Sequence, residues 1–126
     1  MDSGWFDRMK DYKELDVWKK GIDLVIAIYE EIKIFPKDER YALTDQIKRS
    51  VVSIPSNIAE GASRNTTKEL IQFLYIARGS ASELETQIII AEKLGYIKKN
   101  KTLNNEITVI RKMLNALITS LKTNCL

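Results

Sequence analysis

Apolar residues recur along the chain at alternating intervals of three and four, the spacing of one face of an α-helix. Four such rows follow one another, separated by polar or Gly/Pro-containing stretches. Their members are Leu15, Trp18, Ile22, Val25, Tyr29 and Ile32; Leu43, Ile47, Ile54 and Ile58, with Val51 beside them; Leu70, Leu74, Ala77, Ala81, Leu84, Ile88 and Ala91; and Leu103, Ile107, Ile110, Leu114, Leu117 and Leu121. The pattern predicts four amphipathic helices that share one core.

Local signals place the boundaries of the first two helices. Pro36 restricts the residue before it, so the first helix should end near Ile34. Asp38 is a candidate N-cap for the second helix, and Gly61 a candidate left-handed residue at its end. Pro55 lies inside the second row, where it removes one backbone donor. Because the row continues in phase beyond it, we expect a kink and not a break.

The third helix has the clearest signals. Thr66 and Glu69 have the spacing of a capping box, and Gly95 follows the last member of the row. The fourth helix follows a polar turn that contains Asn100. Each connection is short, so helices that are consecutive in sequence should be antiparallel neighbours.

The expected fold is therefore all-α, an antiparallel up-down-up-down, left-handed four-helix bundle. We assign residues 13–123 to the bundle, residues 1–12 to an N-terminal extension and residues 124–126 to a C-terminal tail.

The amino-acid composition excludes several kinds of catalytic and metal site. The 126 residues include five Gly, two Pro, no His and one Cys, Cys125, which excludes a disulfide framework, a zinc finger and a His-based catalytic triad. No pair of carboxylates shares a helix face, and no Gly-rich loop has the P-loop pattern. The sequence thus predicts a protein that is not an enzyme and has no cofactor or metal. The longest uncharged stretch, residues 50–59, is too short to span a membrane, and we expect a cytoplasmic protein.

Two helices carry more apolar residues than one core needs. The first has a second row displaced by about 100°, and the third has isoleucines on several sides. Wider burial within one bundle would explain these residues, and so would contact between subunits of a homo-oligomer, which we favour because contiguous exposed apolar rows are rare on monomers. The candidate interface residues are Val17, Leu24, Ile28, Ile71, Ile76, Ile89 and Ile90.

Helix two also carries a polar row about 120° from Ile47. Such a row could be a solvated face, a hydrogen-bonding network or a ligand-binding strip. We interpret it as a structural network in which Arg49 and Arg78 pair with Glu60, Glu83 or Glu85. The network residues are Gln46, Arg49, Ser53, Asn57, Glu60, Arg78 and Glu83.

Charge is divided unevenly. The net charge is −2 over residues 1–63 and +5 over residues 64–126. A basic surface attracts polyanions, more so when it is repeated around an oligomer. The candidate RNA- or DNA-binding residues are Arg64, Lys68, Lys98, Lys99, Lys101, Arg111 and Lys112.

The chain from Leu15 to Ile97 also resembles a known family. It is similar to the small proteins encoded by intervening sequences within bacterial 23S ribosomal RNA genes, often labelled ribosomal-protein-like. The shared pieces are Leu15-Asp16-Val17-Trp18, Phe35-Pro36 with Glu39-Arg40-Tyr41, Ser53-Ile54-Pro55-Ser56-Asn57-Ile58-Ala59-Glu60-Gly61, Ala77-Arg78-Gly79-Ser80 and Glu83-Leu84.

This resemblance implies a homopentameric ring of four-helix bundles without known enzymatic activity. More distant bundles act as accessory factors in retroelement systems, where a basic ring is thought to engage nucleic acid and a reverse transcriptase. Two functions stay open: an RNA- or DNA-associating accessory protein, and a homo-oligomeric scaffold whose protein partner is unknown. The basic second half favours the first, and the absence of an aromatic or Arg-rich reading motif favours the second.

Overall fold

Four long helices make up the part of the chain that the structure describes, residues 11–39 and 42–124 of a computed structural model. They are α2 (Asp16–Glu31), α3 (Leu43–Ala62), α4 (Thr67–Lys93) and α5 (Lys101–Asn124). Short 3-10 helices precede and follow α2: η1 (Tyr12–Glu14), η2 (Ile32–Ile34) and η3 (Lys37–Glu39). No strand occurs within these ranges. Most of the expected extension, the Arg40-Tyr41 pair and Cys125 lie outside the described residues.

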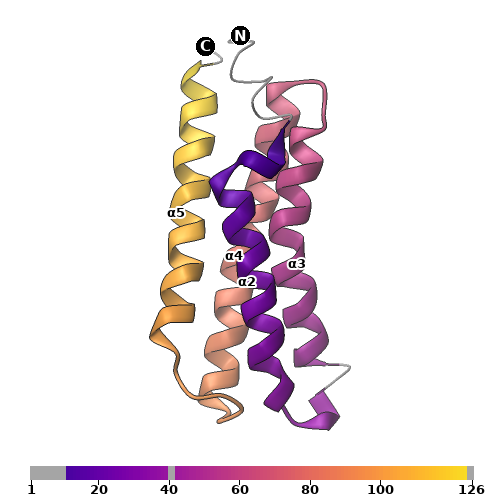
Figure 1. The fold of residues 1–126 in the computed structure, drawn as a ribbon, viewed down its shortest axis with the longest axis vertical. Helices are drawn as coiled ribbons and strands as arrows, with labels where there is room; N and C mark the ends of the chain where they lie inside the picture. The colour runs from indigo at the N-terminus through magenta and orange to yellow at the C-terminus, as the bar shows by residue number, and fades with distance from the viewer. Residues whose placement is uncertain (1–10, 40–41, 125–126) are drawn as a thin grey trace.

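The four helices lie side by side along the long axis of the molecule, and the connections alternate between its two ends (Figure 1). The α2–α3 and α4–α5 connections lie at the bottom of the view, and the α3–α4 turn lies at the top. Contacts join α2 to α3, α3 to α4, α4 to α5, and α5 back to α2. The described chain is therefore a closed bundle of helices around one core, and consecutive helices are neighbours.

The core rows predicted for α3 and α4 are confirmed. All seven members of the α4 row, from Leu70 to Ala91, are buried, as are Ile47, Val51, Ile54 and Ile58 of α3. On α5 the row is buried apart from Leu117, which is half-buried, while its neighbour Ile118 is buried. These side chains belong to one continuous cluster that runs the length of the bundle.

For the first helix the predicted row is only partly correct: Ile32 is buried and Leu15, Trp18 and Val25 are half-buried against the core, but another row packs more deeply. Leu24 and Ile28 are 1% and 0% exposed, and with Val17 they form the face of α2 that packs into the core. These three residues were proposed as an oligomer interface, and that assignment is wrong because a single chain already buries them. Conversely Ile22 and Tyr29, which were predicted to be core residues, are exposed.

A small residue explains which row of α2 faces inward. Gly21 lies in the buried row, and a Cβ added there would be 3.4 Å from the Cβ of Pro55. The missing side chain lets α2 approach α3 at the proline, which is itself buried inside a helix that continues through it. A Cβ alone would reach van der Waals contact there, but a larger side chain would hold the helices further apart, so the row containing Gly21 packs more closely than the Trp18 row could.

Gly61 was predicted to end its helix in a left-handed conformation, and this is wrong. It is helical, and Gly95 is the glycine with a positive φ, 78°, among the described residues. A Cβ on Gly61 would be 2.8 Å from the Cβ of Phe73 and 3.1 Å from Leu70 Cδ1. The absence of a side chain at Gly61 therefore allows α3 and α4 to approach each other closely near their connection. Gly95 ends α4 as expected.

One predicted N-cap is confirmed and one is not. The Thr66 Oγ1 accepts a hydrogen bond from the Glu69 backbone N–H at 3.1 Å, which caps α4. Asp38 lies in η3 and does not cap α3. Instead the Glu39 carboxylate accepts the Leu43 N–H at 3.3 Å.

Glu39 also links the two connections at one end of the bundle. The Tyr96 hydroxyl donates a hydrogen bond to Glu39 Oε1 at 3.2 Å, and its ring packs against Phe35 with 5.6 Å between centroids. Burial raises the pKa of Tyr96 above its ordinary value, and the carboxylate that accepts its hydrogen bond raises it further. Nearby, Asn100 donates to Glu31 Oε1 at 2.7 Å. Polar contacts therefore hold the α4–α5 connection against the end of α2 and the start of α3.

Two sets of large apolar side chains stay exposed on the single chain. We call Ile22, Ile26 and Tyr29 the α2 apolar face, where Ile26 is 61% exposed. We call Ile76, Ile90 and Leu94 the α4 apolar flank, because they lie within about 40° of one another around α4. Of the remaining predicted interface residues, Ile89 is exposed, and Ile71 is half-buried against the core.

Candidate nucleic-acid interface

Basic side chains dominate the C-terminal part of the bundle. We call residues 93–122 the basic segment; it contains one acidic residue, Glu106, and seven basic ones, for a net charge of +6. Residues 11–39, which include α2, carry a net charge of −3. The basic residues of the segment are Lys93, Lys98, Lys99, Lys101, Arg111, Lys112 and Lys122.

Few of these charges are neutralised. Among the described residues, Arg111 alone of the seven pairs with a carboxylate, its Nη1 lying 3.5 Å from Glu85 Oε1. The Nε of Arg111 is buried without a hydrogen-bond partner. An exposed cation without a partner keeps its attraction for an anion in solution, so this segment is the strongest positive region of the described chain.

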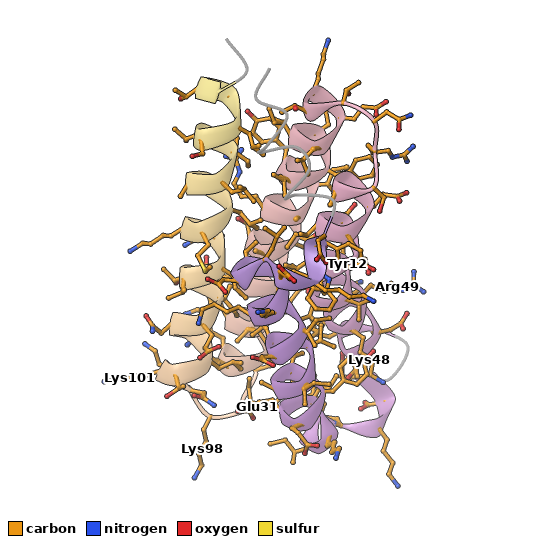
Figure 2. All side chains as sticks on the ribbon, turned by 45° about the horizontal axis from the view of Figure 1, so that its top comes forward. Tyr12, Glu31, Lys48, Arg49, Lys98 and Lys101 are labelled. Carbon is orange, nitrogen blue, oxygen red and sulfur yellow. The ribbon has the colours of Figure 1, made fainter. Side chains whose placement is uncertain are left out.

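The seven predicted nucleic-acid-binding residues do not form one patch. Lys98, Lys99 and Lys101 lie at the α4–α5 connection, and Figure 2 shows Lys98 and Lys101 projecting from that end of the bundle. Arg64 and Lys68 flank the α3–α4 turn at the opposite end (Figure 1). The bundle thus separates the two clusters by the length of its helices.

Arg64 is also a weaker candidate for binding nucleic acid than its position beside the α3–α4 turn suggested. Its guanidinium lies 3.1 Å from Glu60 Oε1 and 4.8 Å from the centroid of the Phe73 ring. The carboxylate neutralises part of its charge, and the aromatic ring occupies one of its faces. Lys68 stays exposed.

A groove of about 710 Å³ runs between α4 and α5 beside the lysine cluster. Lys93, Lys99 and Lys101 line it together with Glu85 and Glu92, so its charge is mixed. The Asn104 amide also donates to Glu92 Oε2 at 3.2 Å. Acidic groups in this groove disfavour a polyanion within it, and the lysines are better placed to contact one outside it.

The predicted polar network is only partly present. The Ser50 hydroxyl donates to Glu83 Oε1 at 2.7 Å, Ser53 and Ser80 share a 2.8 Å hydrogen bond, and the Asn57 amide donates to the Ser53 hydroxyl at 2.8 Å. The first two bonds join α3 to α4, and the third lies within α3 and orients the Ser53 hydroxyl. Ser50 and Ser80 were not among the predicted network residues; Ser50 flanks the predicted row on α3, and Ser80 lies on α4.

The other members of the row do not join this network. Arg49 pairs with Asp45 in its own helix at 2.9 Å and points outward (Figure 2), not toward Glu60 or Glu83. Glu60 pairs with Arg64 as described above, and Gln46 is exposed. These residues form the solvated side of α3, because the row is wider than the contact between two helices.

Arg78 differs most from its prediction. It was expected to pair with Glu60, Glu83 or Glu85, but its Nη1 donates to the Asn115 side-chain oxygen at 3.0 Å. Its guanidinium lies 4.8 Å from the centroid of the Tyr75 ring. Arg78 therefore lies between α4 and α5 beside a neutral acceptor and keeps its full charge. Spacing along the sequence did not indicate Tyr75 and Asn115 as its neighbours, nor Lys122 as a second cation beside Tyr75.

The described residues were also compared with the requirements of a metal site and of a membrane-spanning helix. Within the described residues, no three His, Cys, Asp or Glu side chains are grouped closely enough to hold a metal ion. None of the helices in that part of the chain is both long and apolar enough to cross a bilayer.

Comparison with known families identifies the group to which the chain is related. A family model described as 23S rRNA-intervening sequence protein matches residues 13–116. The chain belongs to this family. The match confirms the resemblance seen in the sequence.

A solved structure supports the membership of this chain in the 23S rRNA-intervening sequence protein family. The structure, from Bacteroides thetaiotaomicron VPI-5482, is described as a protein with unknown function from the S23 ribosomal protein family. It is 27% identical, covers 82% of this chain and 95% of its own, and superposes with a TM-score of 0.75. No curated protein sequence matches significantly. Neither description names an enzymatic activity.

The matched region of this family member ends within α5. It includes the serine contacts between α3 and α4, Arg78 with Asn115, and all three lysines at the α4–α5 connection, Lys98, Lys99 and Lys101. Lys122 lies beyond it.

Proposed function

We propose that this member of the 23S rRNA-intervening sequence family is a non-enzymatic protein that binds RNA or DNA through its basic segment. The observation that carries the proposal is the net charge of +6 over residues 93–122, in which Arg111 alone is paired with a carboxylate among the described residues. Long cationic side chains outside the core can neutralise phosphates without disturbing the fold. Binding to ribosomal RNA would place the protein in the cytoplasm.

The proposed working form is a homo-oligomeric ring, most simply a pentamer, of antiparallel up-down-up-down, left-handed bundles. A ring built by head-to-tail contact needs two different surfaces on each subunit. The α2 apolar face and the α4 apolar flank are two such surfaces, on different helices and both exposed on the single chain. A second copy is the occupant we propose, since each surface supplies the apolar area that the other would cover.

Assembly would strengthen the interaction with nucleic acid. Each subunit adds its own basic segment, and a polyanion that contacts several subunits gains from each of them. The charge difference between residues 11–39 and the basic segment also means that one side of each subunit attracts phosphate more than the other.

Fluorescence anisotropy with labelled ribosomal RNA fragments tests the binding. We expect affinity to fall by orders of magnitude between about 50 and 200 mM salt, because phosphate contacts release counterions. Replacing Lys98, Lys99 and Lys101 by Gln should weaken binding and reduce the salt dependence. The control replaces three exposed lysines outside the segment, Lys13, Lys33 and Lys37, by Gln, with the same loss of charge. Absence of binding at low salt, or equal loss in both triple variants, would refute the proposal.

Light scattering tests the assembly independently. We expect a mass several times the 14.5 kDa of one chain. The double variant Ile22→Glu/Ile26→Glu should lower that mass, while Ala116→Glu/Thr119→Glu, also exposed on a helix, should not. A wild-type mass near 14.5 kDa would contradict the ring. An oligomer that does not bind nucleic acid would favour the alternative, a scaffold for another protein.

A further inference from the structure

A second groove between α4 and α5 has a different charge from the first. It has a volume of about 450 Å³ and is lined by Tyr75, Arg78, Gly79, Ser82, Arg111, Lys112 and Asn115. Three of these seven residues are cations and none is acidic. We call it the arginine groove.

Arg78 is held in place without being neutralised. Stacking on Tyr75 and the hydrogen bond to Asn115 fix its guanidinium, but both partners are uncharged. No carboxylate of the described residues lies within ion-pair distance of it. A guanidinium has five N–H donors, and this contact uses one of them. Arg78 therefore offers several fixed donors and a full positive charge to an anion in the groove.

Two cations, Arg78 and Lys122, lie near the ring of Tyr75, a residue that lines the groove. The Lys122 ammonium donates a hydrogen bond to the Tyr75 hydroxyl at 3.0 Å and lies 5.8 Å from the ring centroid. Arg78 and Lys122 thus lie close to one aromatic ring, although like charges repel each other. An anion between them would relieve that repulsion.

Lys122 lies on the same side of α5 as Arg111, beyond the residues that line the groove. From Arg111 to Lys122 the helix rises roughly 16 Å at about 1.5 Å per residue. This length allows cations on α5 to face more than one phosphate of a strand. Gly79 keeps the opposite wall open, since a Cβ there would meet nothing within 4 Å.

We propose that the arginine groove holds the phosphates of a nucleic-acid strand, with Arg78 as the main phosphate-binding residue. The inference rests on the proposed function and locates its principal site. The arginine groove differs from the lysine cluster at the α4–α5 connection in one physical respect. Arg78 is already fixed by Tyr75 and Asn115, so it loses less side-chain entropy on binding than an exposed lysine does.

The test measures binding of a labelled oligouridylate by anisotropy to Arg78→Gln and to a matched control, Arg49→Gln. Both substitutions remove one arginine charge, but Arg49 is an exposed residue of α3 that pairs with Asp45. We expect Arg78→Gln to weaken binding about tenfold or more, since a hydrogen bond to a charged group contributes more than a neutral one. The slope of log K against log salt should become less steep by about 1. Arg49→Gln should bind nearly as the wild type does.

A second variant guards against misfolding of the first. Asn115→Asp keeps an acceptor for Arg78 but neutralises its charge, so it should also weaken binding while circular dichroism stays unchanged. If the wild type binds the oligouridylate and Arg78→Gln binds it as tightly as Arg49→Gln does, this inference is overturned and the proposed function stays intact. A wild type that does not bind would overturn both.

Free phosphate and a strand are distinguished by competition at constant ionic strength. We expect an unlabelled oligouridylate to displace the probe, and inorganic phosphate or uridine monophosphate to do so only weakly. Displacement by inorganic phosphate as effective as by the oligonucleotide would show a site for the free ion and overturn the assignment to a strand.

Discussion

Gly61→Ala should destabilise the bundle, although alanine is the better helix former. The added Cβ would lie 2.8 Å from the Cβ of Phe73 and 3.2 Å from the backbone oxygen of Leu70. Neither atom can move away by a side-chain rotation, because one is a backbone atom and the other is bonded directly to the backbone. The two helices must therefore separate locally to admit a methyl group.

The magnitude follows from two opposing terms. Overpacking costs about 1–3 kcal/mol, and replacing a helical glycine by alanine contributes about 1 kcal/mol in the other direction. Gly61 has no positive φ, so the second term applies in full. Because a 2.8 Å contact lies well inside van der Waals distance, we expect the overpacking cost to exceed the gain, with a net loss of up to about 2 kcal/mol in the free energy of unfolding. At roughly 2.1 cal/mol/K per residue, this corresponds to a Tm lowered by up to about 8 °C.

Two other glycines supply the controls. At Gly79 a Cβ meets nothing within 4 Å, so Gly79→Ala should stabilise α4 by up to about 1 kcal/mol. At Gly21 the nearest atom would be 3.4 Å away, and Gly21→Ala should fall between the two. Urea unfolding followed by circular dichroism, at one protein concentration, gives all three values. If Gly61→Ala is as stable as the wild type, or if all three variants shift alike, the close-contact reasoning is incorrect.

Three further predictions concern single contacts. Thr66→Ala removes the cap of α4 and should lower the free energy of unfolding by about 1 kcal/mol in urea titrations. Because burial and Glu39 raise the pKa of Tyr96, its hydroxyl should ionise above about 10 in the folded protein. The free energy of unfolding should therefore decline as pH rises through that value, since the unfolded chain loses this proton first. Glu39→Gln should lower the pKa of Tyr96 in an ultraviolet titration. Leu24→Glu should unfold the subunit, seen as loss of the helical circular dichroism signal, because Leu24 is 1% exposed within one chain. A soluble, folded monomer of Leu24→Glu would instead support the interface that the structure argues against.

The sequence predicts the helices of this bundle better than it predicts how their faces are used. The α4 row was predicted correctly because its spacing of three and four continues without a break along the helix, and every member is buried although isoleucines lie on other sides too. On α2 two rows have the same spacing and similar apolar character. The decision between them depends on Gly21 approaching Pro55, a contact between helices that no pattern within one helix contains.

The same limit applies to the candidate site. Charge counting identified the basic second half of the chain, and Arg111 and Lys112 among its residues. Arg78 was assigned to internal pairing because several glutamates are near it in sequence. Its real neighbours, Tyr75 and Asn115, depend on how α4 lies against α5, since Asn115 is 37 residues away. Local spacing cannot supply that alignment.

The hydrogen bonds between α3 and α4 restrict which packings the chain can adopt while it folds. Apolar residues that repeat every three or four positions allow two helices to pack almost equally well after one slides past the other by a turn, about 5.4 Å. Such a slide would separate Ser53 from Ser80 and Ser50 from Glu83. Ser50 is 3% exposed, so it would then be buried without its acceptor, at a cost that the correctly aligned pair does not incur. A polar contact of modest strength thus separates one alignment from others that the hydrophobic core alone would tolerate.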